Sequence, residues 1–146
     1  MTVPLYRVAL VREPSDLHVE VRAIGKSGDA AEVFRPLFAG LDREQFAVMF
    51  LNAKHQPLGL NVVSVGSLTS AIVHHREVFK PAILANAAAV ILCHNHPGGD
   101  PTPSAEDLEI TRRLRESGEL IGIRVLDSLI LGHDPAFYSF VDAGRS

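Results

Sequence analysis

The chain is poor in cysteine, since Cys93 is the single one among its 146 residues. One thiol cannot close an intramolecular disulfide, so a reducing, cytoplasmic compartment is expected. The longest uninterrupted apolar run, residues 87–93, is far shorter than the roughly 20 residues that span a bilayer. The first residues are interrupted by Pro4, Arg7 and Arg12, so no signal peptide is predicted. The sequence therefore predicts a cytoplasmic protein without a membrane segment.

A large excess of charge of one sign is also absent. The chain carries 14 Lys and Arg against 17 Asp and Glu, which gives a net charge of -3 with neutral histidines. No overall positive field therefore attracts nucleic acid, although a local basic patch remains open. Hydrophobic residues make up 47% of the chain, which is enough for a sizeable core. Length and composition together predict one domain over residues 1–146.

Segments with strand-like patterns alternate along the chain with segments of helical periodicity, which predicts an α/β or α+β fold. The expected strands are residues 5–12, 18–24, 45–52, 58–65 and 87–93, two short strands within 120–132, and a closing strand or loop at 137–144. The expected helices are residues 30–38, 75–87 and 105–117. Pro36 should limit the first helix, Pro81 should kink or restart the second, and Gly118 should end the third.

Polar side chains gather in the segment CHNHPGGDPTPSAED, residues 93–107. His94 follows a buried strand directly, and because side chains two apart in an extended chain share a side, His94 and His96 can face one point. The glycine- and proline-rich loop then leads to a helix start that carries Ser104 and Asp107. Ser104 and Asp107 have a structural interpretation as a helix cap. Jointly with the histidines, Asp107 instead completes the three ligands of a catalytic zinc site.

The segment His94–Asp107 resembles the metal motif of the JAB/MPN+ (JAMM) metalloproteases, which is H-x-H, about ten residues, then S-x-x-D. It is most similar to the RadC-like bacterial branch, as are residues 66–92 and 122–132. The resemblance covers residues 44–140 and leaves residues 1–40 as a divergent part. It implies a single MPN/JAB-like domain with a mixed β-sheet flanked by helices, an architecture like that of the cytidine deaminases.

The resemblance also implies roles for individual residues. His94, His96 and Asp107 would hold Zn²⁺, and the family's general base, an upstream glutamate at a strand edge, corresponds best to Glu44. Ser104 would help to stabilise the oxyanion while capping the helix. Glu77 is the rival for the general base, but it falls in a predicted helix. Cys93 stays open as a fourth ligand, with burial in the core as the favoured alternative.

The function that the resemblance implies is hydrolysis of a peptide or isopeptide bond in a protein or peptide substrate. A metal-dependent nuclease acting on DNA in repair is the first alternative, because the same activated water could attack a phosphodiester. The net charge and the lack of a helix-hairpin-helix-like region in the first 40 residues argue against it. The second alternative is a non-catalytic interaction domain, although relatives of that kind have usually lost ligands. The substrate and the oligomeric state stay open.

Overall fold

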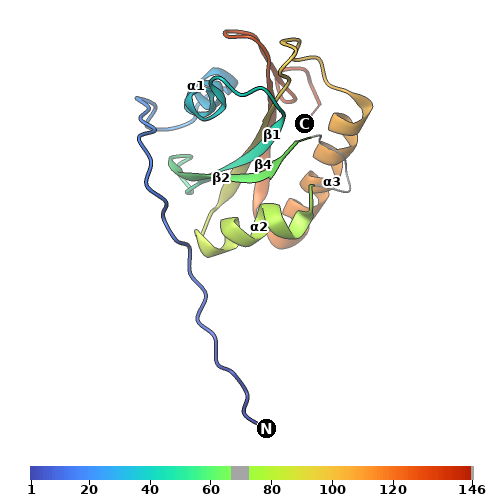
Figure 1. Cartoon of the computed structure of the whole chain (residues 1–146). Coiled ribbons are helices and arrows are strands. Elements are labelled where there is room, and N and C mark those ends of the chain that lie inside the picture. Colours follow the sequence, from blue (N-terminus) through green and yellow to red (C-terminus); the bar gives the residue numbers. More distant parts are fainter. Residues whose placement is uncertain (67–72, 146) are drawn as a thin grey trace.

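Helices and strands occupy most of residues 24–145 in the computed structural model, which describes residues 1–66 and 73–145 (Figure 1). Residues 67–72, part of the family-like stretch 66–92, lie outside the described residues. The strands are β1 Gln45–Leu51, β2 Pro57–Val65, β3 Ala89–Asn95, β4 Arg124–Leu131 and β5 Phe137–Ser139. The helices are α1 Ser27–Phe38, α2 His75–Leu84 and α3 Ala105–Ile121.

The strands form one mixed sheet in the order β2-β1-β3-β4-β5. β1 pairs antiparallel with β2 and with β3, and β4 pairs antiparallel with β5. β3 and β4 are parallel, so the chain needs a crossover between them, and α3 supplies it. The loop from β3 to α3 consequently lies at the carboxyl end of β3, an edge where open α/β sheets tend to place their sites.

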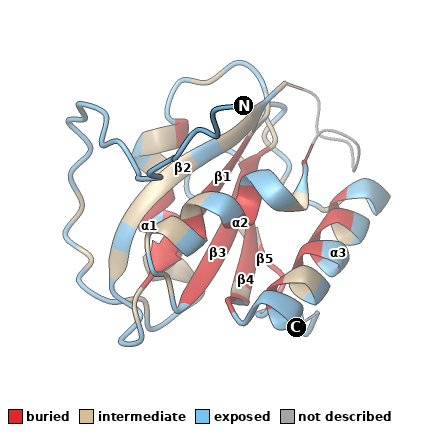
Figure 2. Ribbon diagram, turned by 90° about the horizontal axis from the view of Figure 1, so that it is seen from below, coloured by how far each residue is buried: buried red, intermediate tan, exposed pale blue. Residues whose placement is uncertain are grey.

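Helices cover both faces of the sheet, and each face has its own hydrophobic core. Phe34 of α1 packs with Met49 and Ile91 on one face. On the other face, Phe79 of α2 and Leu114 of α3 pack together with the sheet. β1 and β3 are buried almost throughout, as their red ribbons show in Figure 2. This mixed sheet between helices confirms the predicted fold class.

The two strands expected near the N-terminus are wrong. Residues 5–12 and 18–24 form neither helix nor strand, and residues 1–18 are all exposed. An alternating pattern produces a strand only where a neighbouring strand pairs with it. Val19, Val21 and Ile24 instead pack against the α1-side core, and the Ile24 N–H donates to the carbonyl of His55 at 2.9 Å.

Both prolines lie inside their helices, so Pro81 does not restart the second helix, while the first ends at Phe38 as expected. α1 begins three residues before its expected start and contains Pro36, and α2 continues through Pro81. A proline in a helix releases the carbonyl four residues earlier. Those carbonyls belong to Glu32 and Glu77, which are exposed, so water can satisfy them.

The third helix also differs from the expectation, since Gly118 lies inside it. α3 ends at Ile121 and is capped by Gly122, which has φ +85° and whose N–H donates to the Gly118 carbonyl. A Cβ on Gly118 would lie 2.5 Å from the Ile123 carbonyl oxygen, so this glycine allows close packing rather than ending the helix.

The two strands expected within residues 120–132 are a single strand, β4. The polar pair Asp127–Ser128 lies in its middle. Both residues are buried, but the Asp127 carboxylate accepts hydrogen bonds from the N–H groups of Ser128 and Val141 and from the Ser139 hydroxyl. A satisfied carboxylate can stay inside a strand, so β4 continues. No helix among the described residues is long and apolar enough to cross a membrane.

Candidate metal centre

Two histidines stand at the carboxyl end of β3. His94 lies within the strand, not after it, because β3 extends to Asn95. Cys93 belongs to the α1-side core, so its neighbour His94 faces the side covered by α2 and α3. The His94 ring stacks on the Phe46 ring of β1, with ring centroids 6.0 Å apart. His96 follows at the strand end, and its N–H donates to the Leu131 carbonyl of β4 at 2.8 Å.

The first turn of α3 brings Asp107 to the histidines. Ser104 is the N-cap, and its hydroxyl accepts a hydrogen bond from the Asp107 N–H at 3.1 Å. The Asp107 carboxylate accepts one in return from the Ser104 N–H at 2.8 Å. This reciprocal capping box satisfies helix N–H groups and fixes the direction of the carboxylate. The capping interpretation of Ser104 and Asp107 is therefore correct, and it positions the same carboxylate beside the imidazoles.

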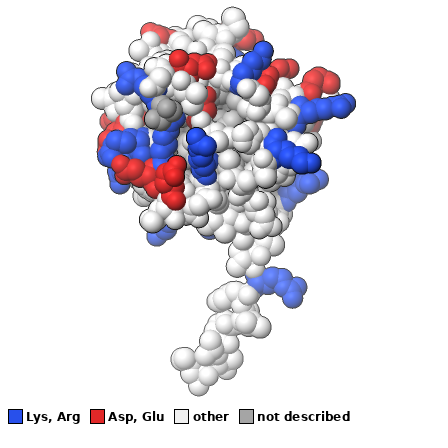
Figure 3. Space-filling view, turned by 180° about the vertical axis from the view of Figure 1, so that it is seen from behind, with Lys and Arg blue, Asp and Glu red and all other residues white. Residues whose placement is uncertain are grey.

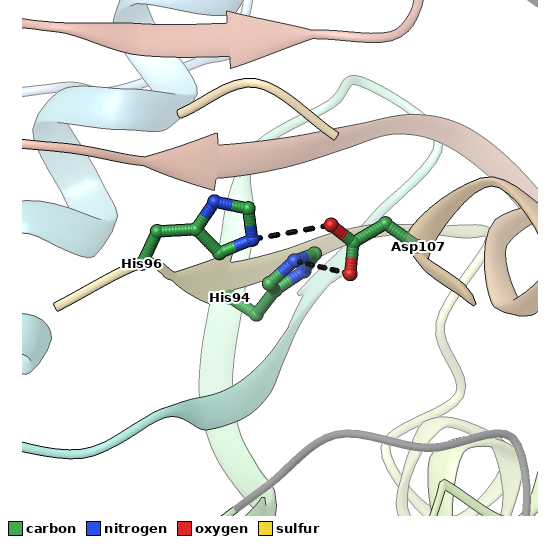
Figure 4. Close-up of side chains that lie close together, drawn as sticks. All are labelled: His94, His96 and Asp107. Atoms are coloured by element: carbon green, nitrogen blue, oxygen red, sulfur yellow. Dashed lines mark hydrogen bonds and ion pairs between the residues drawn. The ribbon is translucent and has the colours of Figure 1, made fainter. Parts of the chain in front are cut away.

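Figure 4 shows both imidazoles and the carboxylate converging on one point. The Nε2 atoms of His94 and His96 each lie 3.1 Å from one of the two Asp107 oxygens. One ligand atom from each residue lies within 4.8 Å of the others. Ligands bound about 2.0–2.1 Å from one zinc ion at tetrahedral angles stand roughly 3.4 Å apart. The spacing therefore fits three ligands of a single ion.

The hydrogen bonds of His96 indicate that a proton or a cation lies beside its Nε2 atom and the Asp107 carboxylate. Its Nδ1 lies 2.8 Å from the Asp100 carbonyl oxygen, and because a carbonyl can only accept, Nδ1 carries a proton. In the neutral ring, Nε2 then presents a lone pair to the Asp107 carboxylate. Two acceptors facing each other require a proton or a metal ion between or beside them. A histidine that donates one N–H to a carbonyl is typical of metal ligation.

His94 gives independent support. Its side chain is 3% exposed, and neither ring nitrogen makes a hydrogen bond, since the approach to Asp107 has the distance of an ion pair without hydrogen-bond geometry. A buried imidazole without hydrogen bonds is rare and unfavourable by about 1–3 kcal/mol. A metal ion at Nε2 would give one of the two ring nitrogens a partner, so the residues present fit a divalent cation.

The Asp107 carboxylate is ionised in this environment. Burial by itself raises the pKa of Asp107, but the nearby His94 ring and the N–H and hydroxyl of Ser104 outweigh burial and hold the pKa well below its usual range. The start of α3 also favours a negative charge at this position. The carboxylate is therefore available as an anionic ligand at neutral pH.

The two glutamates considered as general base lie in different places. Glu44 is half-buried and directly precedes β1, and its carbonyl accepts a hydrogen bond from the Gly66 N–H at 2.7 Å. Phe46, two residues later, pairs with His94 in the sheet register. Glu77 is exposed on α2, with its carboxylate 3.6 Å from the Lys80 ammonium.

Cys93 lies on the opposite face of β3 from His94. It is fully buried in the α1-side core, and this burial raises the pKa of its thiol well above the ordinary value. A thiol that stays protonated on the other face of the sheet is a core residue. The favoured alternative for Cys93, burial in the core, therefore holds.

A cavity of about 480 Å³ lies beside His96, between the end of α1, the end of β3 and the loop from β4 to β5. Arg35 and His133 line it together with apolar residues such as Leu41. The Arg35 guanidinium donates to the carbonyls of Gly132 and Ala136, so it holds the wall of the cavity. This cavity could not be predicted from the sequence, because its walls come from three segments far apart in the chain.

Gly99 in the β3–α3 loop is predicted to be essential for the loop's geometry. It has φ +98°, and a Cβ there would lie 2.0 Å from the His133 ring. Gly99→Ala should lower the free energy of unfolding by about 1–3 kcal/mol, measured by urea denaturation. Gly98→Ala is the matched control, since a Cβ at Gly98 meets nothing within 4 Å. Equal effects of the two substitutions would contradict the assignment.

The RadC-like JAB domain is the family whose model matches this sequence, over residues 24–145. That range includes the whole sheet, the three helices and all residues of the metal centre. The chain belongs to the RadC-like JAB domain family. The family predicted from the segment His94–Asp107 is thereby confirmed.

Among curated proteins, the RadC-like JAB domain is similar to several named UPF0758 proteins. The UPF0758 protein of Moorella thermoacetica is 61% identical over 92 residues, which are 63% of this chain and 40% of that protein. Those of Symbiobacterium thermophilum and Desulfitobacterium hafniense are 55% and 48% identical, over 77% and 83% of this chain and 48% and 53% of theirs. The chain thus spans about half the length of these relatives. The family and the group of His94, His96 and Asp107 together support a metal-dependent hydrolase.

Proposed function

We propose that this RadC-like JAB domain is a zinc-dependent peptidase or isopeptidase acting on a protein or peptide. The observation that carries the proposal is the convergence of His94, His96 and Asp107, with a buried imidazole that lacks hydrogen bonds. Two imidazoles and one carboxylate are a ligand set that catalytic zinc sites use, with a further position left for water. Bound zinc would supply Lewis acidity, which lowers the pKa of water toward neutrality and polarises a carbonyl group.

Glu44 is proposed as the general base. Opposite residues of an antiparallel pair share a face, and Phe46 pairs with His94, so the alternation along the chain extends that face to Glu44 and to His96. A carboxylate on this face can take a proton from the attacking water and deliver it to the nitrogen of the leaving amine. Glu77 is not proposed for this role, because it is exposed on α2 beside Lys80.

Ser104 is proposed to stabilise the oxyanion that forms on the scissile carbonyl. Its oxygen accepts from the Asp107 N–H, so its own hydroxyl proton stays available for donation. A donor aimed at a developing oxyanion typically contributes about 10²–10³ in rate. Capping and oxyanion stabilisation use different parts of one hydroxyl and are compatible.

The cavity beside His96 is proposed to receive a side chain of the substrate next to the scissile bond. Its volume of about 480 Å³ is ample for a side chain, and the one arginine in its lining, the half-buried Arg35, is already engaged by carbonyl groups. Neutral or apolar groups are therefore the best match. On the face in Figure 3, Lys and Arg side chains are interspersed with Asp and Glu, an arrangement that offers no continuous track for a phosphate backbone.

A cleavage assay with two substrate classes tests the proposal. The zinc-loaded chain is incubated with a peptide library that includes isopeptide-linked branched peptides, and separately with labelled single-stranded DNA. We expect peptide cleavage that is abolished by a chelator and by His94→Ala, with the DNA intact. Zinc-dependent DNA cleavage lost in His94→Ala would identify a nuclease. No cleavage of either class would favour a non-catalytic interaction domain.

A further inference from the structure

Exposed apolar side chains concentrate in two places in the described part of the chain. One is the N-terminal segment, defined as residues 1–18, where Leu5, Tyr6 and Val8 are 98%, 82% and 67% exposed. The other is β2, where Leu58 and Val65 are exposed. Scattered apolar residues are normal on a protein surface, but concentrations of this kind mark interaction sites.

β2 is an edge strand that carries no charged side chain. Within the described residues it pairs only with β1, so one of its sides presents unpaired backbone groups. Its nine residues, PLGLNVVSV, include no charged side chain such as the lysine that commonly blunts natural edges, and its pairing with β1 shifts register at two places. The opposite edge, β5, has only three residues. In Figure 2, β2 is largely tan and pale blue beside the red central strands.

The N-terminal segment has the composition of a strand that could pair with the free edge of β2. Residues 5–12, LYRVALVR, contain a tyrosine and two valines, which favour strands. This is the stretch whose pattern predicted a strand that the single chain does not form. Residues 1–14 make no hydrogen bond to another described residue, so their backbone groups are free to pair.

The path of the N-terminal segment favours pairing with β2 of a second copy over pairing with β2 of the same chain. Val19, Val21 and Ile24 are held against the α1-side core, and Ile24 is bonded to His55 in the turn that leads into β2. From this anchor the segment runs away from the domain, and Figures 1 and 3 show it projecting as an extended, mostly uncharged arm. To reach its own β2 the arm would have to reverse direction, whereas an edge on a neighbouring molecule requires no reversal.

We propose that residues 5–12 of one chain add as a strand to the free edge of β2 in a second copy, and that the exchange is reciprocal. Backbone hydrogen bonds would provide the affinity, as in other cases of strand addition. In a two-fold dimer, the N-terminal segment of each chain pairs with β2 of the other chain. Both β2 edges and both segments are then occupied, so assembly stops at a dimer. This inference does not depend on the proposed peptidase activity.

Molar mass in solution, measured by light scattering across a range of concentrations on the full chain, tests the exchange. The wild type should show twice the 15.8 kDa mass of one chain. Tyr6→Asp with Val8→Asp in the arm, and separately Val62→Lys on the exposed part of β2, should each shift the mass to that of a single chain. Leu120→Asp, at a 90% exposed site on α3, is the control and should remain dimeric.

Mixing the arm variant with the Val62→Lys variant distinguishes an exchange from any other interface. The Val62→Lys chain keeps an intact N-terminal segment, and the arm variant keeps an intact β2 edge. These two can pair, so a heterodimer should form although neither variant dimerises alone. Circular dichroism checks that each variant keeps its fold. A monomeric wild type, a dimer that survives either variant, or a mixture that stays monomeric would each overturn the proposal.

Discussion

Glu44→Gln is expected to reduce the rate of peptide cleavage by about 10²–10⁴-fold, the usual contribution of a general base. The amide has nearly the shape of the carboxylate but cannot accept a proton from water at neutral pH. Glu44 is half-buried at the start of β1 and outside the group of three ligands, so the substitution should leave zinc content unchanged. Initial rates and zinc content are measured on the same preparations.

Glu77→Gln is the matched control for this prediction. It makes the same chemical change in an exposed glutamate of α2, whose carboxylate forms a weak ion pair with Lys80. Its cleavage rate should stay within about twofold of the wild type, since surface substitutions of this kind have small effects. A Glu77→Gln variant that loses activity while Glu44→Gln keeps it would reverse the assignment of the general base.

The second large effect concerns stability. Zinc that binds the folded chain and not the unfolded one should raise the free energy of unfolding by about 2.7 kcal/mol at a free concentration 100 times its Kd. His94→Ala should abolish this response, because it removes one of three ligands, and a chelator should remove it from the wild type. Thermal or urea unfolding with and without zinc measures the effect.

His18→Ala is the control for the stability measurement. His18 lies exposed in the N-terminal segment, outside the group of His94, His96 and Asp107, so its removal should leave the zinc response intact. If zinc raised the free energy of unfolding of His94→Ala as much as that of the wild type, zinc would be binding at a different site.

The arrangement of the candidate centre could be predicted because its residues are close in the sequence and obey local rules. Side chains two apart on a strand share a face, which brings His94 and His96 together. The Ser104–Asp107 spacing is that of a capping box, and the same box directs the Asp107 carboxylate. The stacking of Phe46 on His94 was not predictable, because the register between β1 and β3 is set by contacts across the sheet.

The errors in the fold have a common physical origin in tertiary context. Gly118 reads as a helix end, but its lack of a side chain serves close packing against the Ile123 carbonyl. Pro36 and Pro81 read as interruptions, but the residues whose carbonyls they release, Glu32 and Glu77, are exposed. Residues 5–12 and 18–24 have strand-like sequences but form no strand, because no neighbouring strand among the described residues pairs with them.

Metal analysis of the purified chain is the most direct test of the central claim, that His94, His96 and Asp107 form a metal centre. The wild type and His94→Ala are incubated with zinc, and a desalting column then removes loosely bound ions. The zinc content of each protein is measured by elemental mass spectrometry. The account predicts one zinc ion per wild-type chain and far less than one per His94→Ala chain. A wild type that retains no zinc, or a variant that retains as much as the wild type, would contradict it.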